Sequence, residues 1–250
     1  SIISSLLYTN DGVFNFDYLK KIRQFPGHEY FKELIKDPND IHEIKKTWLL
    51  AQEKVNLDGQ IKFFKTHQGN YIIDKYPFTN SQNTLATIYI VRDPRNLISS
   101  ISNHYNISVE ESSKFIKSTK FLKGKFEEDN KTFKHVKALL GNWSEHYYSW
   151  TKKNENLLLI KYENLLAEPL EELNRIINFL KKYMEINNSK EKNDNILKTT
   201  SFENLRKMEE DGKFTENVYT RSKEKVKFFH LGANNKWEEK IENKISNDIE

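Results

Sequence analysis

The sequence predicts an α/β fold, with a doubly wound, mostly parallel sheet and helices on both of its faces. Residues 61–65 and 86–91 are short apolar segments that each stop abruptly on charged and polar residues, as buried strands do. A third such segment, 157–161, follows further helical patterns. Strands that alternate with helices favour parallel pairing through right-handed crossovers. Because no internal repeat or linker is visible, we predict a single domain over residues 1–250.

The first predicted strand is preceded by helical patterns at 1–8, 17–24, 28–36 and 39–54. In the first of these, Ile2, Ile3, Leu6 and Leu7 fall at helical spacing. Between the two strands, residues 68–84 form a loop rich in polar and aromatic residues.

Beyond the second strand, the sequence predicts a series of helices interrupted by polar segments. A long helix over 132–151 is indicated by apolar residues that include Val136, Leu139 and Trp143. Ile241, Ile245 and Ile249 likewise fall on one side of a helix. The full order is helices at 95–105 and 108–119, a charged linker-like stretch at 120–131, the 132–151 helix, the 157–161 strand, a helix at 169–183, a polar run at 187–195 and a helix at 237–250.

Composition excludes several classes of function. Forty basic and thirty-six acidic residues leave a charge of +4 spread along the chain, which favours a local anion site over a nucleic-acid arm. The absence of cysteine excludes disulfides, thiol catalysis and thiolate zinc sites. No run approaches eighteen apolar residues, so we expect no membrane span. We expect a cytoplasmic protein, with a signal upstream of Ser1 left open.

Polar side chains follow both early strands. Lys65, Thr66 and His67 end the first strand, whereas Arg92 ends the second and leads into a helix that carries Ser100. Ligands of parallel α/β sheets bind at the carboxyl ends of the strands, so we expect these residues to face one crevice. A base-capable histidine beside a lysine, with an arginine and a serine suited to a phosphate, outlines a group-transfer site.

Ordinary structural roles remain open for each of these residues. His67 is equally compatible with a hydrogen-bonded loop histidine, and Lys65 with a solvent-exposed lysine at a strand end. Arg92 has a plausible ion-pair partner in Asp93 or another nearby carboxylate. The spacing alone does not decide among these roles.

The order of these motifs resembles the sulfotransferases that use 3′-phosphoadenosine 5′-phosphosulfate. The resemblance rests first on the Lys-Thr-His and Arg-Asp-Pro-Arg-Asn segments. Residues 156–165 resemble the family's later strand ending in Tyr-Glu-Asp/Asn, and residues 200–202 resemble its Thr-Ser-Phe turn. Gly232 and Trp237 stand where the family has an Arg-Lys-Gly-x-x-Gly-x-Trp loop. The matches run in order from about Lys65 to Trp237.

The resemblance implies a role for each matching residue within a P-loop NTPase-like fold. His67 would be the general base, and Lys65 would steady charge on the transferred group. The cofactor-binding residues would be Arg92 and Ser100 at the 3′-phosphate, Tyr162 and Phe202 beside the nucleotide, Ser201, and Gly232 through its amide. Core packing for Phe202 and helix capping for Ser201 remain open as alternatives.

The chain departs from the family pattern in two places. Where the family has Arg-Lys-Gly at the 3′-phosphate, this chain has His230-Leu231-Gly232, and Asn235 replaces the next glycine. Either the 3′-phosphate is held more weakly here, or Lys225 or Lys227 replaces the missing basic residues. The family's first strand and 5′-phosphosulfate loop have no counterpart. We therefore expect a chain cut inside a helix at both ends, with a natural variant that dispenses with the loop as the alternative.

The implied reaction transfers a sulfuryl group to a hydroxyl or amine and leaves adenosine 3′,5′-bisphosphate, without a metal. We expect a small-molecule or glycan acceptor, in a pocket whose walls are residues 8–30 and 68–84. We expect no nucleic-acid partner, and a homo-oligomer is left open. Two alternatives remain: a non-catalytic nucleotide-binding domain of the same fold, and a kinase-like nucleotide transferase, which would need an upstream phosphate-binding loop and carboxylates for magnesium.

Overall fold

The computed structural model describes residues 1–127, 132–152, 155–214, 218–219 and 225–249. The chain divides into two compact units, each assembled from separate stretches of sequence. The first unit comprises Ser1–Lys21, Ile90–Ile116 and Leu158–Glu250, and the second comprises Ile22–Tyr89 and Lys117–Leu157.

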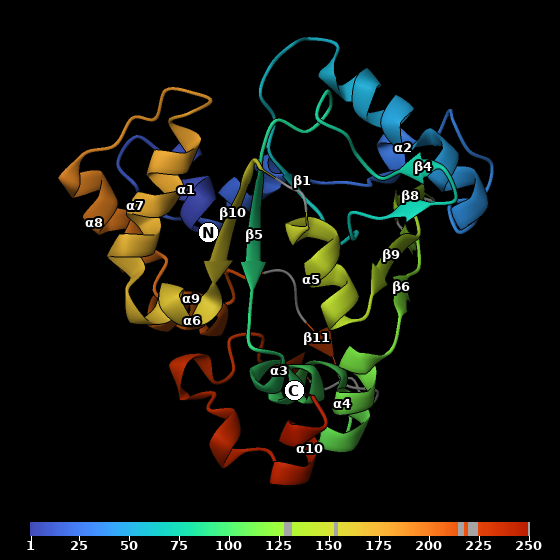
Figure 1. Ribbon diagram of the computed structural model, residues 1–250. Coiled ribbons are helices and arrows are strands. Elements are labelled where there is room, and N and C mark those ends of the chain that lie inside the picture. Colours follow the sequence, from blue (N-terminus) through green and yellow to red (C-terminus); the bar gives the residue numbers. More distant parts are fainter. Residues whose placement is uncertain (128–131, 153–154, 215–217, 220–224, 250) are drawn as a thin grey trace. The chain divides into compact units, whose positions relative to one another are not determined.

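Strands β5 (Thr87–Val91) and β10 (Leu157–Lys161) hydrogen-bond to each other and run side by side in the same direction (Figure 1). Both were predicted from sequence, within a residue of their observed ends. Ile160 of β10 is buried, as expected for a sheet covered by helices. Each strand is followed at once by a helix, so the residues at its carboxyl end lie at a strand-to-helix junction.

Helices make up most of the first unit. In α7, Leu173, Ile176, Ile177 and Leu180 recur at helical spacing and are all buried. α7 packs on α8, and α8 packs on α1 (Figure 1). The elements besides β5 and β10 are α1 (Ile2–Tyr8), η1 (Phe16–Lys21), α3 (Pro94–Tyr105), α4 (Val109–Lys117), α6 (Tyr162–Ala167), α7 (Pro169–Leu180), α8 (Lys190–Thr199), α9 (Phe202–Glu210), β11 (Val218–Tyr219), β12 (Lys225–Val226), η3 (Gly232–Asn234), η4 (Trp237–Glu239) and α10 (Asn243–Asn247).

The second unit is built around an aromatic core. Trp48 of α2 is fully buried, and its ring meets Phe78 edge-on, as does Trp150 of α5. Strand β2 lies parallel to β1, whereas the other pairs described in this unit are antiparallel. Its elements are β1 (Arg23–Gln24), η2 (His28–Tyr30), α2 (Ile41–Asn56), β2 (Phe64–Lys65), β3 (Ile72–Ile73), β4 (Tyr76–Pro77), β6 (Lys120–Leu122), β7 (Lys125–Glu127), β8 (Thr132–His135), β9 (Ala138–Gly141) and α5 (Trp143–Thr151).

The predicted long helix over 132–151 is wrong in its first half, where β8 and β9 form instead. Gly141 has a φ of +74°, a left-handed conformation that a continuous helix does not contain. Asn142 then caps α5 through a reciprocal pair of hydrogen bonds with Glu145. The 120–131 stretch, predicted as a linker, likewise contains β6 and β7 among its described residues.

Several other boundaries differ from prediction. The first predicted strand is reduced to Phe64–Lys65, and the predicted 28–36 helix to one 3₁₀ turn at His28–Tyr30. The polar run at 187–195 is partly helical, because Ser189 caps α8 through the Lys192 amide. No helix in the described parts of the chain is both long and apolar enough to cross a bilayer.

Candidate functional site

Arg92 occupies the junction between β5 and α3 in the first unit. Asp93 caps α3 by accepting the Arg95 amide, and Pro94 takes the first helical position, where its missing N–H costs nothing. The Asp93 carboxylate also accepts two hydrogen bonds from the Arg95 guanidinium, at 3.0 and 2.8 Å. Asp93 therefore pairs with Arg95, and the guanidinium of Arg92 is directed elsewhere.

The Arg92 guanidinium lies between a hydroxyl and an aromatic ring. Its Nη1 donates to Ser100 Oγ at 3.0 Å, and its Cζ lies 4.7 Å from the centre of the Tyr162 ring. Its Nε is buried, with no hydrogen-bond partner in the described structure. Burial lowers the pKa of Arg92, although an arginine remains charged at neutral pH. A half-buried cation with an unused donor is suited to bind an anion.

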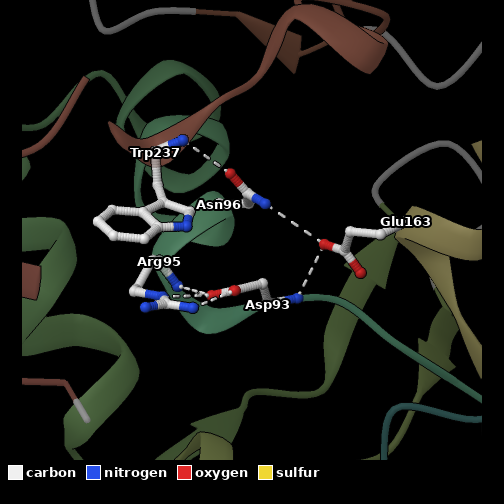
Figure 2. A network of polar contacts seen from close by, with 5 residues as sticks. All are labelled: Asp93, Arg95, Asn96, Glu163 and Trp237. Carbon is white, nitrogen blue, oxygen red and sulfur yellow. Dashed lines mark hydrogen bonds and ion pairs between the residues drawn. The ribbon is translucent and has the colours of Figure 1, made fainter. Parts of the chain in front are cut away.

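A network of polar contacts holds this junction in place (Figure 2). Glu163, at the start of α6, accepts the Asp93 amide at 3.0 Å and the Asn96 side-chain amide at 3.4 Å. Asn96 in turn accepts the Trp237 amide at 3.0 Å. The Trp237 ring lies against Arg95, 4.1 Å from its Cζ. Glu163 and Trp237 thus join β10–α6 and the C-terminal segment to the start of α3.

Asn235, which stands where the resemblance leads us to expect a glycine, is a buried part of this arrangement. Its amide donates to the Asn96 carbonyl at 2.8 Å and to Ser100 Oγ at 3.4 Å, and its Oδ1 accepts a hydrogen bond from Ser99. Asn235 therefore fixes the face of α3 that carries Ser100.

Phe202 and Gly232 are in close contact. Gly232 has a φ of +55°, and a Cβ built there would lie 2.6 Å from the Phe202 ring. The Phe202 ring also meets Phe229 edge-on. Glycine is therefore required at position 232 both by the backbone conformation and by the ring packed on it. Ser201 caps α9 by accepting the Asn204 amide, which gives it the structural role that the sequence left open.

Lys227 is one of the two lysines that could replace the missing basic residues at the 3′-phosphate. Lys227 Nζ is 3.0 Å from Glu210 Oε1, so its charge is already paired. The side chain of Lys225 lies outside the described residues.

In the second unit, Lys65 and His67 stand at the end of β2. The Lys65 side chain is exposed, and its carbonyl accepts the Phe25 amide at 2.9 Å. Gln68, directly after His67, is fully buried and accepts the Leu139 amide through its side chain. The Gln68 carbonyl also accepts the Trp150 indole N–H. Gln68 thus anchors the segment, while His67 stays at its surface.

The imidazole of His67 is kept neutral by its surroundings. Partial desolvation, with Lys65, His146 and His135 adding repulsion, lowers the pKa of His67 to about 4. The ring is nevertheless solvent-exposed. The His67 carbonyl lies 3.3 Å from Nε2 of His146, whose Nδ1 lies 2.8 Å from the Tyr89 hydroxyl. Burial also lowers the pKa of His146. At pH 7, His67 is therefore able to accept a proton.

The structure brings some of the predicted residues together. Arg92 contacts both Ser100 and Tyr162 in the first unit, and Phe202 contacts Gly232 in the same unit. Lys65 and His67 belong to the second unit, so the crevice expected to join them to Arg92 remains a prediction.

Three supporting residues were not identified from sequence: Glu163, Asn96 and Asn235. Asn96 and Glu163 stand within segments that carry the resemblance, but the partners of all three residues lie far along the chain, so no local pattern indicated their supporting role. The expected acceptor walls also need revision, because Phe78 belongs to the aromatic core and Phe14 and Phe16 pack in a cluster with Phe214. The described residues contain no group of three or more metal-ligating side chains that could hold an ion.

A charged and polar strand-to-helix junction on an α/β scaffold is typical of nucleotide-binding proteins. A family model for the sulfotransferase domain matches residues 11–250, and the chain therefore belongs to the sulfotransferase family.

Two curated relatives agree with this assignment over about half of the chain. Human sulfotransferase 2A1 is 28% identical over 138 residues, which cover 54% of this chain and 43% of that protein. Mouse sulfotransferase 1B1 is 29% identical over 147 residues, which cover 58% and 44%. The chain thus spans less than half the length of these relatives.

Solved structures support the same fold. Retinol dehydratase in complex with retinol and adenosine 3′,5′-bisphosphate (PAP) aligns with a TM-score of 0.56 and 16% identity, over 99% of this chain and 72% of that one. The same enzyme with androsterone and the inactive cofactor PAP gives a TM-score of 0.54, with equal identity and coverage. The prediction of an α/β sulfotransferase fold is confirmed.

Proposed function

We propose that the protein transfers a sulfuryl group from 3′-phosphoadenosine 5′-phosphosulfate to a hydroxyl or amine of a small-molecule or glycan acceptor. The observation that carries this proposal is the half-buried guanidinium of Arg92, which contacts Ser100 and Tyr162 and keeps one donor unused. Membership of the sulfotransferase family indicates which anion it binds.

On this proposal, the first unit holds the nucleotide. Arg92 and Ser100 bind the 3′-phosphate, since a guanidinium offers charged donors in a fixed plane and the serine adds a hydroxyl. Tyr162 and Phe202 flank the nucleoside, and Gly232 contributes its backbone amide. The related structures with bound PAP support this assignment of the cofactor class. Ser201 contributes by capping the helix that carries Phe202.

The second unit supplies the proton chemistry. Neutral His67 takes the proton from the acceptor while the acceptor oxygen or nitrogen attacks sulfur, and the bond from sulfur to the phosphate oxygen breaks. PAP leaves with the electron pair of that bond. Lys65 stabilises the charge that develops on the transferred group and on the leaving phosphate. The chain's own residues thus act mainly by positioning and charge stabilisation.

Isothermal titration calorimetry with PAP and with adenosine 5′-monophosphate tests the nucleotide assignment. We expect PAP to bind at least about tenfold more tightly, because only PAP carries the 3′-phosphate that Arg92 and Ser100 would bind. Equal affinities would contradict the assignment. In the full-length protein, release of PAP from the phosphosulfate in the presence of acceptors tests turnover. Nucleotide binding without turnover would favour the non-catalytic alternative.

A further inference from the structure

A second concentration of positive charge lies in the second unit, where helix α2 meets the β3–β4 turn. The side chains there line a cavity of about 550 Å³. Three of them come from one face of α2, since positions 42, 45 and 46 are three and four residues apart. The lining residues are His42, Lys45, Lys46, Asp74, Lys75 and Tyr76.

Lys45 is the least exposed of the charged residues that line this cavity. Its side chain is only 4% exposed, which is rare for a lysine. Its ammonium donates to Asp74 Oδ2 and lies 3.4 Å from His42 Nδ1. An ammonium has three N–H donors, so these two acceptors leave one donor for a ligand.

Asp74 reaches Lys45 from the turn between β3 and β4. It stands at the first position of this two-residue turn with a φ of 57°, a left-handed conformation that aspartate adopts more readily than most other residues. Its side chain is 68% exposed, and the contact with Lys45 holds the pKa of its carboxyl below the usual range. Asp74 is thus a largely solvated carboxylate that occupies one side of a buried cation.

The charges of the cavity do not balance. Lys45, Lys46 and Lys75 contribute three positive charges and Asp74 one negative charge, which leaves +2 when His42 is neutral. Lys46 and Lys75 are exposed at its rim, and the Lys75 ammonium lies 5.7 Å from the centre of the Tyr76 ring. We propose that this cavity is a second anion site, separate from the Arg92 site, which binds a doubly charged oxyanion: sulfate, phosphate or a phosphate monoester.

Titration calorimetry of the full chain with inorganic sulfate, inorganic phosphate and phenyl phosphate tests this proposal, with sodium chloride at matched ionic strength as the reference. We expect at least one of the three to bind above the chloride reference. Tighter binding of phenyl phosphate would indicate an organic ester as the ligand, and equal or tighter binding of the inorganic ions a free one. No binding beyond chloride would overturn the proposal.

Variants then assign the site. Lys46→Ala with Lys75→Ala should weaken binding about tenfold or more, because two charged donors are lost. The control is Lys32→Ala with Lys36→Ala, which removes the same charge from exposed lysines of the same unit. Anion affinity in this control should stay within about twofold of that of the unmodified protein. The same lysine pairs are also compared in the Arg92→Ala background, which removes any contribution from the nucleotide site. An equal loss of anion binding in both lysine pairs would overturn the proposal.

Asp74 provides the sharpest comparison. If its carboxylate competes with the ligand for Lys45, Asp74→Asn should tighten anion binding several-fold. The matched control is Asp58→Asn. Asp58 is an exposed aspartate whose Oδ2 lies 2.6 Å from Lys62 Nζ, and neither residue lines the cavity. An equal gain in anion affinity in both variants would show that only the net charge of the protein matters, and it would contradict a specific site.

Discussion

The two groups of proposed functional residues, one in each compact unit, are held in different ways. Arg92 is half-buried, and its guanidinium contacts Ser100 and Tyr162 directly. His67 is an exposed residue, and His146 contacts its backbone carbonyl. The guanidinium is therefore preorganised for a ligand, whereas the imidazole keeps the freedom to adjust to one.

This difference separates binding from chemistry. A fixed, partly desolvated charge interacts strongly with an anion, and many neighbours share in keeping it there. A general base acts through one side chain, and its neighbours affect it mainly through its pKa. Changes around Arg92 should therefore appear in nucleotide affinity and stability, whereas changes around His67 should appear in turnover and its pH dependence.

The largest expected effect is that of His67→Ala on turnover. Loss of a general base should lower kcat by about 10²–10⁴-fold, with nucleotide affinity nearly unchanged. Steady-state kinetics on the full-length protein, together with PAP titration, would measure both quantities. His104→Ala is the control, because His104 lies at the end of α3 and has no proposed role. Near-normal turnover in the His67 variant would remove this residue from the mechanism.

Gly232→Ala should be the most destabilising change on the nucleotide side. Its Cβ would meet the Phe202 ring at 2.6 Å, and alanine disfavours a φ of +55°. Together these should lower the free energy of unfolding by about 2–4 kcal/mol.

Gly212→Ala separates the two causes in chemical denaturation. Gly212 has a φ of +75°, yet no atom lies within 4 Å of its Cβ position. The Gly212→Ala change should therefore lower the free energy of unfolding by only about 1–2 kcal/mol, through backbone strain. Equal losses in the two variants would show that the contact with Phe202 is unimportant.

Arg92→Ala should come next, with an effect on affinity. Removing a charge-assisted hydrogen bond to the 3′-phosphate should weaken PAP binding by about 1.5–3 kcal/mol. Binding of adenosine 5′-monophosphate, which lacks that phosphate, should change little. Arg206→Ala is the matched control, because Arg206 pairs with Glu210 on the surface of α9. A uniform loss for both nucleotides would place Arg92 away from the 3′-phosphate.

The sequence was a good guide where local signals and chemistry coincide. β5 and α3 were recognised because an apolar run, Asp93-Pro94 and a serine-bearing helix follow one another. By contrast, β8 and β9 carry apolar residues that also fit a helical period, so only the strand partners and the turn at Gly141 decide between the two. Periodicity does not reveal contacts between distant segments.

The same limit applies to the site. Arg92 and Ser100 lie on adjacent elements, and their position at a strand end and on the helix that follows was visible in the sequence, whereas their role at a phosphate was implied by the resemblance. Asn235 was read as a departure from a glycine, although in the structure its side chain bonds to α3. Hydrogen bonds between residues more than a hundred positions apart leave no trace in a single sequence, so this role was visible only in the fold.

A smaller effect should distinguish two roles of Glu163. As an acceptor it holds the Asp93 amide, but as a negative charge it opposes a phosphate near Arg92. Glu163→Gln keeps an acceptor oxygen and removes the charge, so PAP affinity should be equal or higher. Glu163→Ala removes both, and affinity should fall by about 0.5–1.5 kcal/mol. Weakening by the same amount in both variants would show that the charge, rather than the positioning, is what matters.

The smallest effect should be that of Lys65→Met on the titration of His67. Lys65 repels the imidazolium, so its removal should raise the pKa of His67 from about 4 toward the ordinary value of 6.5. The rise should be only part of that difference, because desolvation is the larger cause. Since a base must be neutral to act, the acid limb of the rate profile should move to higher pH.

Nuclear magnetic resonance titration of the His67 ring would measure this pKa directly. Lys62→Met is the control, because Lys62 pairs with Asp58 and does not contribute to the His67 shift. High salt should reduce the difference between the Lys65 variant and the unmodified protein, since an exposed ammonium is screened. An unchanged or lower pKa of His67 in the Lys65 variant would show that Lys65 does not repel the imidazolium, and that desolvation and the neighbouring histidines account for the lowered pKa.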